Sequence, residues 1–585
     1  MKTYESLKTL NKYFWRYKFK LLLGILFILL SNLAQVYIPI LLKDSIDLLK
    51  NDISKEVLLN YALLIVGVAL IGGFFRFLIR TTIIIVSREI EYDLRKDFWQ
   101  HIQKLPTRFF QNNTTGNIMA HATNDINAIR MYIGPAVMYS FDTIFKFIMV
   151  IAMMLTLDPL LTLYALIPLP LMSYLVYKLS NKIHTKFLKI QEKFSEVTSK
   201  AQESFSGIRV VKSYAIEDSE LKQFAKLSDE YLKRNMDKVK IQAFFMPMLF
   251  FITGVSVIIV VWLGGIKVID GVMTLGEIVA FVAYLSLLIW PMVAFGWIAN
   301  IIQQASASMK RLLNILNEKE EIKSVDASKY SNKKINGEIE FRNVSFKYEP
   351  NLEDILKNIS FTVPTGSSLA IVGHTGSGKT SLINLIPRLF DTTDGDIFLD
   401  GTNIKKIPLG ELRKSIGLVP QETFLFSDTL MNNIAYGLDS YTEEGITKIA
   451  KIAQLSKDVE SFSDGYSTVL GERGITLSGG QKQRSSLARA LAINPKILIL
   501  DDSFSAVDTH TEDEILKNLK EFMKDRTSII ISHRISTVKD ADQIIVLENG
   551  KIAEHGTHKE LVTLNGIYAD LNNKQLLEKE LKDII

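Results

Sequence analysis

The sequence predicts a polytopic α-helical membrane domain followed by an α/β domain, and three observations carry this prediction. The 585 residues are 48% hydrophobic and 22% charged, with a mean hydropathy of +0.16. That charged fraction is typical of a soluble protein, but the hydropathy is too high for one, so the apolar residues must be concentrated. The long apolar runs all lie before about residue 305, and from about Asn317 short apolar strands alternate with Gly/Asp turns.

Composition also excludes several classes of function. The net charge of +5 is spread over the whole chain, so no basic or acidic tail indicates a nucleic-acid partner. The chain has no cysteine, which excludes disulfides, thiolate metal sites and a cysteine nucleophile. The first apolar run, 21–42, is too long for a cleavable signal and predicts a membrane span.

Six apolar runs of about 20 residues predict six transmembrane helices, because in lipid a single-segment span satisfies its backbone groups only as a helix. The runs are roughly 21–42, 57–75, 133–157, 160–179, 244–264 and 278–302. Basic residues crowd the N-terminal flank, which predicts a cytoplasmic N-terminus and, after six spans, a cytoplasmic C-terminal domain. The aromatic and basic segment 4–19 predicts an elbow helix in the membrane surface.

The two inner connections, 81–131 and 180–242, are long, charged and helical in pattern, whereas the outer loops are short. This asymmetry predicts transmembrane helices that continue far into the cytoplasm. Two small cytoplasmic domains are the alternative, but neither stretch has the strand pattern or the density of turns that a domain needs.

A glycine-rich segment in the second half predicts a phosphate site. Residues 373–380, Gly-His-Thr-Gly-Ser-Gly-Lys-Thr, fit G-x-x-x-x-G-K-[ST] between an apolar strand and a helical pattern, as the motif requires. Backbone N–H groups of such a loop wrap phosphates, while Lys379 is expected to reach the β/γ-phosphates and Thr380 to bind Mg²⁺. The predicted nucleotide-binding residues here are Gly373, Thr375, Gly376, Ser377, Gly378, Lys379, Thr380 and Ser381.

A second element of this site is the apolar strand 497–500, which ends in Asp501 and Asp502. We expect Asp501 to hold Mg²⁺ and Asp502 to face the attacking water. A buried strand that ends in a solvated aspartate pair is the structural alternative, and the upstream phosphate loop makes it the weaker one.

Between these elements lies Leu477-Ser478-Gly479-Gly480-Gln481, and with this segment the chain resembles the ABC ATPases, whose signature it is. Further segments resemble that family's motifs in the same order, over residues 341–556. The resemblance implies that Tyr348 stacks on adenine, that Gln421 senses Mg²⁺ and the membrane domain, and that His533 contacts the γ-phosphate. It also places Asp508 in the D-loop 505–508 and makes 471–474, Gly-Glu-Arg-Gly, similar to a segment found in exporters.

The family's roles divide the site residues into three groups. The catalytic group is Asp502, His533 and Gln421; the metal ligands are Thr380, Gln421 and Asp501. The remaining nucleotide contacts are Tyr348, Asp508 and the signature residues Ser478, Gly479, Gly480 and Gln481. With one motif set in the chain, the resemblance implies a dimer in which ATP lies between one chain's phosphate loop and the other chain's signature.

The membrane half resembles the exporters of this family more loosely, through segments 105–125 and 207–214, which look like coupling-helix regions. The fold implied is an ABC exporter membrane domain of six long helices joined to a P-loop ATPase domain. We therefore assign 1–315 to the transmembrane domain, 316–337 to a linker, 338–575 to the ATP-binding domain and 576–585 to a C-terminal tail.

One departure from the family pattern concerns catalysis. ABC ATPases usually carry a glutamate after the Mg²⁺ aspartate, and here the residue is Asp502. Its side chain is one methylene shorter, and water positioning is sensitive to displacements of about 1 Å. In one interpretation, which we favour, the chain is half of a heterodimer whose own phosphate-loop site hydrolyses slowly. In the other, a homodimer uses Asp502 as the base in both sites.

Few charges fall inside the spans. Asp142 and Lys146, four residues apart in the third span, share a helix face and are expected to pair. Arg76 and Arg80, near the inner end of the second span, are expected to reach lipid phosphates or to lie beyond the bilayer, without a role in cargo binding. Such a largely apolar interior favours hydrophobic drugs or lipids over sugars or ions.

The function predicted from these features is ATP-driven export of an amphipathic or hydrophobic small molecule across the plasma membrane by alternating access. The chain would be a multi-pass membrane ATP hydrolase with ATP and Mg²⁺ as cofactors, a second half-transporter as partner and lipid around it. Two alternatives stay open: a partly degenerate regulatory subunit of a heterodimeric exporter, and an importer built on the same scaffold.

Overall fold

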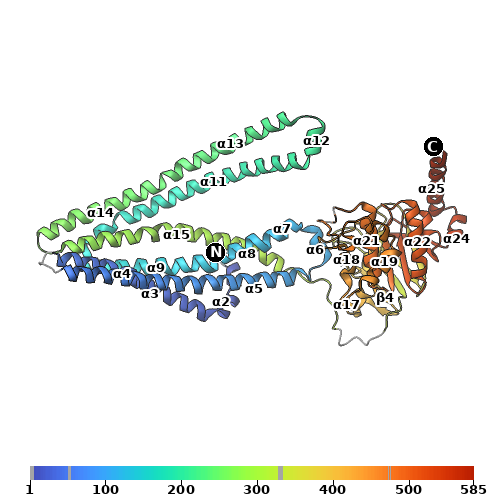
Figure 1. Ribbon diagram of the computed structural model, residues 1–585, viewed down its shortest axis with the longest axis horizontal. Coiled ribbons are helices and arrows are strands. Elements are labelled where there is room, and N and C mark those ends of the chain that lie inside the picture. Colours follow the sequence, from blue (N-terminus) through green and yellow to red (C-terminus); the bar gives the residue numbers. More distant parts are fainter. Residues whose placement is uncertain (1–4, 50–54, 327–333, 472–473, 475, 585) are drawn as a thin grey trace. The chain divides into compact units, whose positions relative to one another are not determined.

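The computed structural model describes residues 5–49, 55–326, 334–471, 474 and 476–584 (Figure 1). The chain divides into two compact units, Met1–Gln103 with Thr115–Glu318 and Lys104–Thr114 with Lys319–Ile585. Part of the expected linker, 327–333, lies outside the described residues, as do the start of the elbow segment and Glu472 and Arg473 of the exporter-like segment. The proposed domain boundaries stay predictions, and the grouping of 104–114 with the C-terminal unit differs from them.

The first unit is helical, and six of its helical stretches are long and apolar enough to cross a membrane, as predicted. Within the described residues they are Lys18–Leu48, Lys55–Ile102, Thr115–Leu157, Pro159–Ser206, Glu217–Ile269 and Leu275–Leu316. The elements are α1 Glu5–Lys8, α2 Asn11–Arg16, α3 Lys18–Leu48, α4 Lys55–Ile79, η1 Arg80–Ile84, α5 Ile85–Ile102, α7 Thr115–Ala120, η2 His121–Asp125, α8 Ile126–Met131, η3 Tyr132–Ala136, α9 Val137–Leu157, α10 Pro159–Leu166, α11 Pro168–Ser206, α12 Ile208–Ser213, α13 Glu217–Ala243, α14 Phe245–Ile269 and α15 Leu275–Leu316, where η1–η3 are π-helical.

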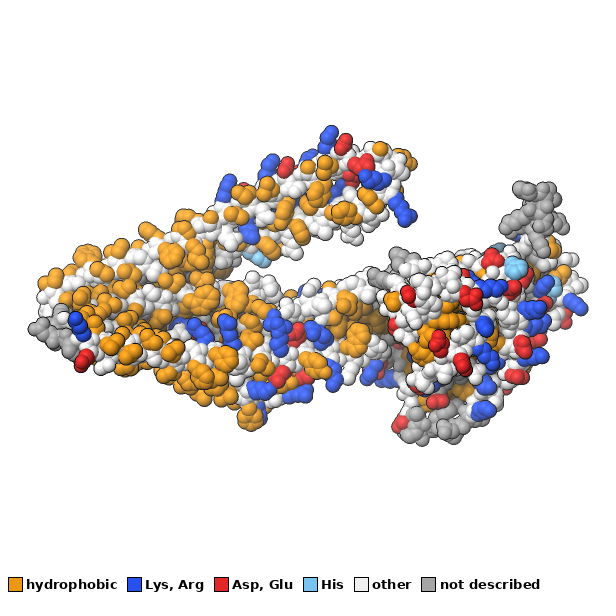
Figure 2. All heavy atoms as spheres, viewed as in Figure 1, with side chains coloured by type: hydrophobic (Ala, Val, Ile, Leu, Met, Phe, Trp, Pro, Cys, Tyr) orange, Lys and Arg blue, Asp and Glu red, His pale blue; other side chains and the backbone are white. Residues whose placement is uncertain are grey.

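These helices extend well past a bilayer, as the long inner connections predicted. The 48 residues of α4–η1–α5 span about 72 Å, against a hydrocarbon core of about 30 Å. In Figure 1, α11 and α13 run side by side and α12 joins them at one end. Figure 2 shows hydrophobic side chains over the half of this unit that contains the apolar runs, and charged side chains on the extensions.

The tight outer turn between the third and fourth spans has a local cause. Asp158 caps α10 by accepting a hydrogen bond from the Leu161 backbone N–H at 2.8 Å, and Pro159 occupies the first helical position, where no donor is needed. The Asp158 carboxylate also pairs with Lys267 near the end of α14. One aspartate therefore starts α10 and ties it to α14.

The elbow segment forms α1 and α2 and is held against α5. Lys12 pairs with Asp97 at 3.0 Å, and Arg16 pairs with Asp93 at 3.0 Å. Trp15 is 69% exposed on the same segment, as expected for a residue that rests in the membrane surface.

The second unit is an α/β domain, and two sheets are found among its described residues. Its strands are β1 Ile339–Phe346, β2 Leu356–Val363, β3 Ser368–Val372, β4 Asp394–Leu399, β5 Thr402–Asn403, β6 Ile416–Val419, β7 Ile497–Asp501, β8 Thr527–Ile531, β9 Gln543–Glu548 and β10 Lys551–Gly556. Its helices are α6 Thr107–Asn112, α16 Lys379–Leu385, α17 Leu409–Lys414, η5 Ile404–Lys406, α18 Leu430–Ile434, η6 Ala435–Gly437, α19 Glu443–Ile452, α20 Ser456–Val459, η7 Gly465–Ser467, α21 Gly479–Ala492, α22 Thr509–Met523, α23 Ile535–Val538, α24 His558–Thr563 and α25 Ile567–Ile584.

The larger sheet sets the place of the site. Its order is β10-β9-β3-β8-β7-β6, parallel except for the β9–β10 pair, while β2-β1-β4-β5 form an antiparallel sheet. Strands β3, β7 and β8 are apolar and almost fully buried, as parallel strands covered on both faces must be. Because they run in the same direction, the residues that follow them meet at one edge, where open α/β sheets bind ligands.

Candidate functional site

A cavity of about 330 Å³ lies at that edge of the larger sheet. Its lining is Ile355, Thr375, Gly376, Gly378, Lys379, Thr380, Ser381, Gln421, Asp501, Asp502, Ile531 and His533. The phosphate loop follows β3, the aspartates end β7, His533 follows β8 and Gln421 follows β6. Ten of the predicted site residues, separated by up to 158 positions in the sequence (533 minus 375), therefore share one cavity.

The phosphate loop has a conformation that needs glycine. Gly373 has φ +149° and Gly378 has φ +101°, values that other residues rarely adopt. A Cβ on Gly373 would lie 2.2 Å from the backbone oxygen of Leu547 in β9, whereas a Cβ on Gly376 would meet nothing within 4 Å. The loop is thus pressed against the sheet at Gly373 and open at Gly376, where a phosphate can approach the backbone.

The ammonium of Lys379 is buried in this loop. Lys379 is 7% exposed, and its Nζ donates to the backbone oxygens of Gly373 and His374, each at 2.9 Å. Burial lowers the pKa of Lys379, and the nearby carboxylates of Asp501 and Asp502 partly oppose that shift. Burial outweighs these carboxylates, so the Lys379 cation is under-compensated and an anionic phosphate group suits this position.

The two aspartates differ in their surroundings. Asp501 is 3% exposed, and burial raises its pKa, as does the charge of Asp502. A hydrogen bond with Thr380 and the charges of Lys379 and His533 lower it. Asp502 is half-buried and has φ +44°, and its backbone N–H donates to the Ile531 oxygen at 2.9 Å. Asp502 therefore offers a carboxylate at the rim, whereas Asp501 offers one inside.

The residues present fit ATP and Mg²⁺. Thr380, Gln421 and Asp501 bring a hydroxyl, an amide and a carboxylate oxygen to one cavity, and Mg²⁺ binds such hard oxygen ligands beside substrate phosphates. Within the same loop, the Ser377 hydroxyl is buried without a hydrogen-bond partner among the described residues. A donor left unpaired in this way is costly, and phosphate oxygens can satisfy it.

Tyr348 lies beside the cavity but does not line it. Its hydroxyl and that of Ser381 are hydrogen-bonded at 2.9 Å, and its ring packs edge-on against Phe390 with centroids 5.1 Å apart. Its backbone oxygen accepts a hydrogen bond at 3.0 Å from Arg108 of α6, the first coupling-like segment. Arg108 also pairs with Glu321. A link from that segment to the expected adenine contact was not predicted, because nothing local in the sequence pairs Arg108 with Tyr348.

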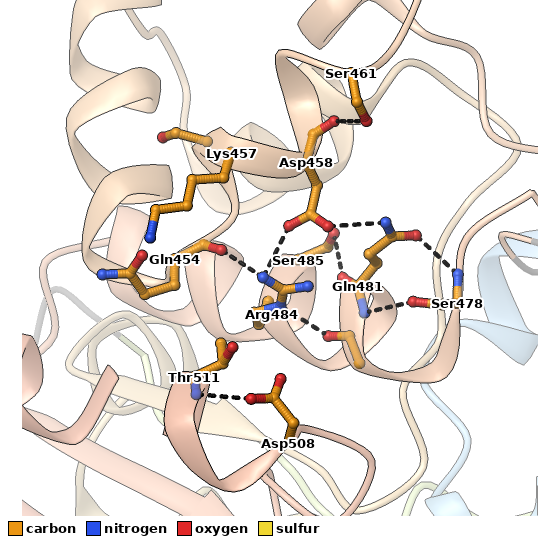
Figure 3. A network of polar contacts seen from close by, with 12 residues as sticks. Gln454, Lys457, Asp458, Ser461, Ser478, Gln481, Arg484, Ser485, Asp508 and Thr511 are labelled. Atoms are coloured by element: carbon orange, nitrogen blue, oxygen red, sulfur yellow. Dashed lines mark hydrogen bonds and ion pairs between the residues drawn. The ribbon is translucent and has the colours of Figure 1, made fainter. Parts of the chain in front are cut away.

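The signature residues lie away from this cavity, at the start of α21. Ser478 caps the helix and forms a capping box with Gln481. The other end of the Gln481 amide donates to Asp458 of α20 at 2.9 Å, and Asp458 pairs with Arg484 at 2.8 Å (Figure 3). Asp508 stands nearby as the cap of α22, accepting from the Thr511 backbone N–H at 2.9 Å. The five predicted contacts Ser478, Gly479, Gly480, Gln481 and Asp508 are therefore not brought to this chain's own phosphate loop.

Asp458 was not among the predicted residues, and it fixes the N-terminus of the signature helix. We expect Asp458→Ala to lower the ATP turnover of the assembled dimer by about tenfold, because it frees Gln481 and leaves the half-buried Arg484 without its carboxylate, at about 1–3 kcal/mol. ATP binding to the chain's own phosphate loop is expected to stay unchanged. Turnover and equilibrium ATP binding measured on the same preparation check both points.

The matched control is the neighbouring Lys457→Ala. Among the described residues Lys457 makes one ion pair, an exposed one with Glu514 at 3.5 Å, so its loss should matter little. Equal turnover in Asp458→Ala and Lys457→Ala would contradict a positioning role for Asp458.

Two family models match the chain: the ABC transporter transmembrane region over residues 21–292, and the ABC transporter model over residues 356–505. A probable multidrug resistance ABC transporter ATP-binding/permease protein of Bacillus subtilis, YheI, is 36% identical over 587 residues, 98% of each chain. The multidrug resistance-like ATP-binding protein MdlA of Escherichia coli is 36% identical over 88% of this chain and 87% of that protein. A bacterial Atm1-family ABC exporter solved with ATP bound has a TM-score of 0.78 and 27% identity, covering 95% of this chain and 98% of that one.

Proposed function

The chain belongs to the ABC transporter family, as an exporter half-transporter with a membrane domain and an ATPase domain, and on that premise we propose that it exports an amphipathic small molecule. ATP hydrolysis by the C-terminal domain drives the transport. The membrane domain crosses the membrane several times, with the ATPase domain on the cytoplasmic side. The direction, the class of cargo and the partner are the parts that we propose.

The observation that carries the ATPase mechanism is the shared cavity. Lys379 and the loop N–H groups bind the β- and γ-phosphates, and the Asp502 carboxylate orients the attacking water and accepts its proton. His533 contacts the γ-phosphate, and Tyr348 stacks on adenine. Thr380, Gln421 and Asp501 would hold Mg²⁺, which supplies charge neutralisation between the phosphates.

A dimer is supported by two features. The signature at α21 lies outside this chain's own cavity, so it is available to a second chain's nucleotide. The hairpin α11–α12–α13 also exposes large apolar side chains, including Val210 at 57% and Tyr214 at 75%, and α13 has no buried residue. We favour a heterodimer over a homodimer because Asp502 replaces the family's glutamate. In the related regulatory-subunit alternative, this chain binds ATP more than it hydrolyses it.

Amphipathic cargo is supported by the interior of the membrane domain and by the relatives. Buried hydrophobic side chains form the core that joins α3, α9, α10, α11, α14 and α15, and the names of several relatives include multidrug resistance. Drugs and lipids are therefore the classes that we propose, with surrounding membrane lipid as the medium from which they enter.

The test is transport in inside-out vesicles that contain the purified assembly. We expect ATP-dependent accumulation of a lipophilic dye inside the vesicles, abolished in Lys379→Ala. Accumulation of a hydrophilic metabolite with indifference to lipophilic dyes would overturn the proposed cargo. ATP-dependent depletion of the vesicle interior would indicate the importer alternative.

A further inference from the structure

A second cavity, of about 390 Å³, opens at the surface of the helical unit, where Arg76, Arg80 and Trp290 are exposed. Helices α3, α4, α9 and α15 and the π-helical turn η1 contribute its lining, which is Ile28, Arg76, Ile79, Arg80, Met138, Tyr139, Asp142, Lys146, Ser286, Leu287 and Trp290. Every lining residue belongs to one chain and to one unit. The cavity is large enough for a small amphipathic molecule, at the lower end of the usual range for ligand pockets.

The charges of this cavity do not cancel. Lys146 and Asp142 pair at 3.3 Å and are nearly buried, with side chains 6% and 17% exposed, so they neutralise each other as the sequence predicted. Arg76 and Arg80 have no ion pair within the part of the chain that the structure describes. The formal charge of the lining is therefore three cations minus one anion, or +2.

The structure adds a cavity to the surroundings of the two arginines. Their expected place, at the lipid phosphates or beyond the bilayer, stays a prediction, and both exposed side chains contribute to the lining of this cavity. Both follow the apolar run 57–75, so the cavity lies toward the inner end of the spans. Arg80 also begins the π-helical turn η1, a kind of helix irregularity that is frequent at functional sites. An ionisable residue that faces a cavity at membrane depth indicates a ligand or ion pathway.

Part of the lining is aromatic. The rings of Tyr139 and Trp290 meet edge to face with centroids 6.3 Å apart, and Trp290 is 51% exposed although it lies in a membrane span. Aromatic faces of this kind bind flat apolar groups. The cavity thus has, on α4–η1, two guanidinium groups with no ion pair to any described residue, and aromatic rings on α9 and α15.

We propose that this cavity binds anionic amphiphiles, with the sulfonate, carboxylate or phosphate group at Arg76 and Arg80 and the aromatic or aliphatic body against Tyr139 and Trp290. Guanidinium groups suit such anions because they are always charged and donate in a planar fork. The proposal rests on the proposed export function and narrows its cargo from amphiphiles in general to those with a negative head group.

The test compares two ligands that differ only by a negative group. 8-Anilinonaphthalene-1-sulfonate is an anion, and N-phenyl-1-naphthylamine is its neutral parent. Binding of each to the purified assembly in phosphatidylcholine nanodiscs is measured above the binding to empty discs. We expect Arg76→Gln/Arg80→Gln to weaken anion binding on the order of tenfold while changing binding of the neutral compound much less. For each compound, the dissociation constant of the variant is divided by that of the wild type. This ratio is independent of how the compound partitions into lipid.

Two matched variants keep this test sharp. Arg76→Lys/Arg80→Lys retains both charges and is expected to keep most of the anion preference. Lys178→Gln removes one exposed positive charge near the inner end of the fourth span, outside the cavity. It is expected to leave the affinity for the anion, relative to that for the neutral compound, unchanged. An equal loss of anion binding in Lys178→Gln would show a general surface-charge effect and overturn the proposal, as would tighter binding of ethidium, a cation, in the wild type than in the double variant.

Two sources of the anion are separated by adding phosphatidylglycerol to the nanodiscs. Unchanged sulfonate binding assigns the cavity to a cargo molecule, whereas competition that depends on the arginines assigns it to an anionic lipid head group. Failure of the export function itself is recognised separately, as absence of ATP-dependent uptake of any dye in vesicles.

Discussion

Asp502→Asn is expected to lower the ATP turnover of the chain purified alone by about 100-fold or more, because it removes the carboxylate that orients water and accepts its proton. The variant removes the carboxylate without disturbing the backbone. Asp502 has φ +44°, and asparagine adopts this conformation as readily as aspartate, so the backbone N–H bond to Ile531 is retained. Steady-state hydrolysis in nanodiscs, with the oligomeric state measured on the same sample, checks the prediction.

The wild-type rate in the same experiment decides between the two dimers. Solid turnover that Asp502→Asn abolishes indicates a homodimer with Asp502 as base. Negligible turnover alone, and a change of less than about twofold by Asp502→Asn in the complex with a partner, indicates a heterodimer whose partner site does the hydrolysis. Turnover of the chain alone that survives in Asp502→Asn would contradict the role of Asp502.

Asp502→Glu is a less simple variant than the family pattern implies. Glutamate extends the reach by one methylene, but it must adopt a left-handed backbone conformation that costs about 1 kcal/mol for longer side chains. A gain in turnover would therefore mean that the length of the side chain at position 502 limits ATP hydrolysis more than backbone strain does.

Gly373→Ala is expected to abolish ATP binding and to destabilise the ATPase domain by about 3 kcal/mol or more. Its Cβ would lie 2.2 Å from the Leu547 backbone oxygen, and φ +149° is unfavourable for alanine. Because the neighbour is the backbone of a central strand, the phosphate loop must move instead, and Lys379 then loses its position. ATP-analogue binding and the midpoint of thermal unfolding of the full chain measure the two effects.

Gly410→Ala is the matched control. Gly410 lies in α17, where a methyl group on its Cα would meet no heavy atom within 4 Å, and its φ is an ordinary helical one. Alanine there should therefore be neutral or stabilise the domain by up to about 1 kcal/mol. Wild-type ATP binding by Gly373→Ala would mean that β9 yields to the methyl group, and the close approach would then have no role in shaping the site.

Local sequence was enough for most of the fold class and for the elements of the ATP site. Apolar runs of membrane length identify spans because lipid leaves no other partner for the backbone, and six helices of that kind are present among the described residues. The phosphate loop is recognisable because its glycines and Lys379 are adjacent in the chain. Asp502 and His533 were predicted from short segments in which strand and site residue are also adjacent.

Only the tertiary structure decided which distant side chains meet. The parallel order of β3, β8, β7 and β6 brings Lys379, Asp501 and Gln421 into one cavity, a result of strand pairing that no local pattern contains. Asp458 holds the signature helix, although its surrounding sequence is that of an ordinary surface segment. Arg76 and Arg80 show the same limit, since whether a cation at a helix end faces lipid, solvent or a cavity depends on how α4 is rotated against its neighbour α3. The sequence determined which functional side chains the chain contains. Packing determined which of them meet and which face a cavity, because helix rotation and strand order are set by contacts between residues far apart in the chain.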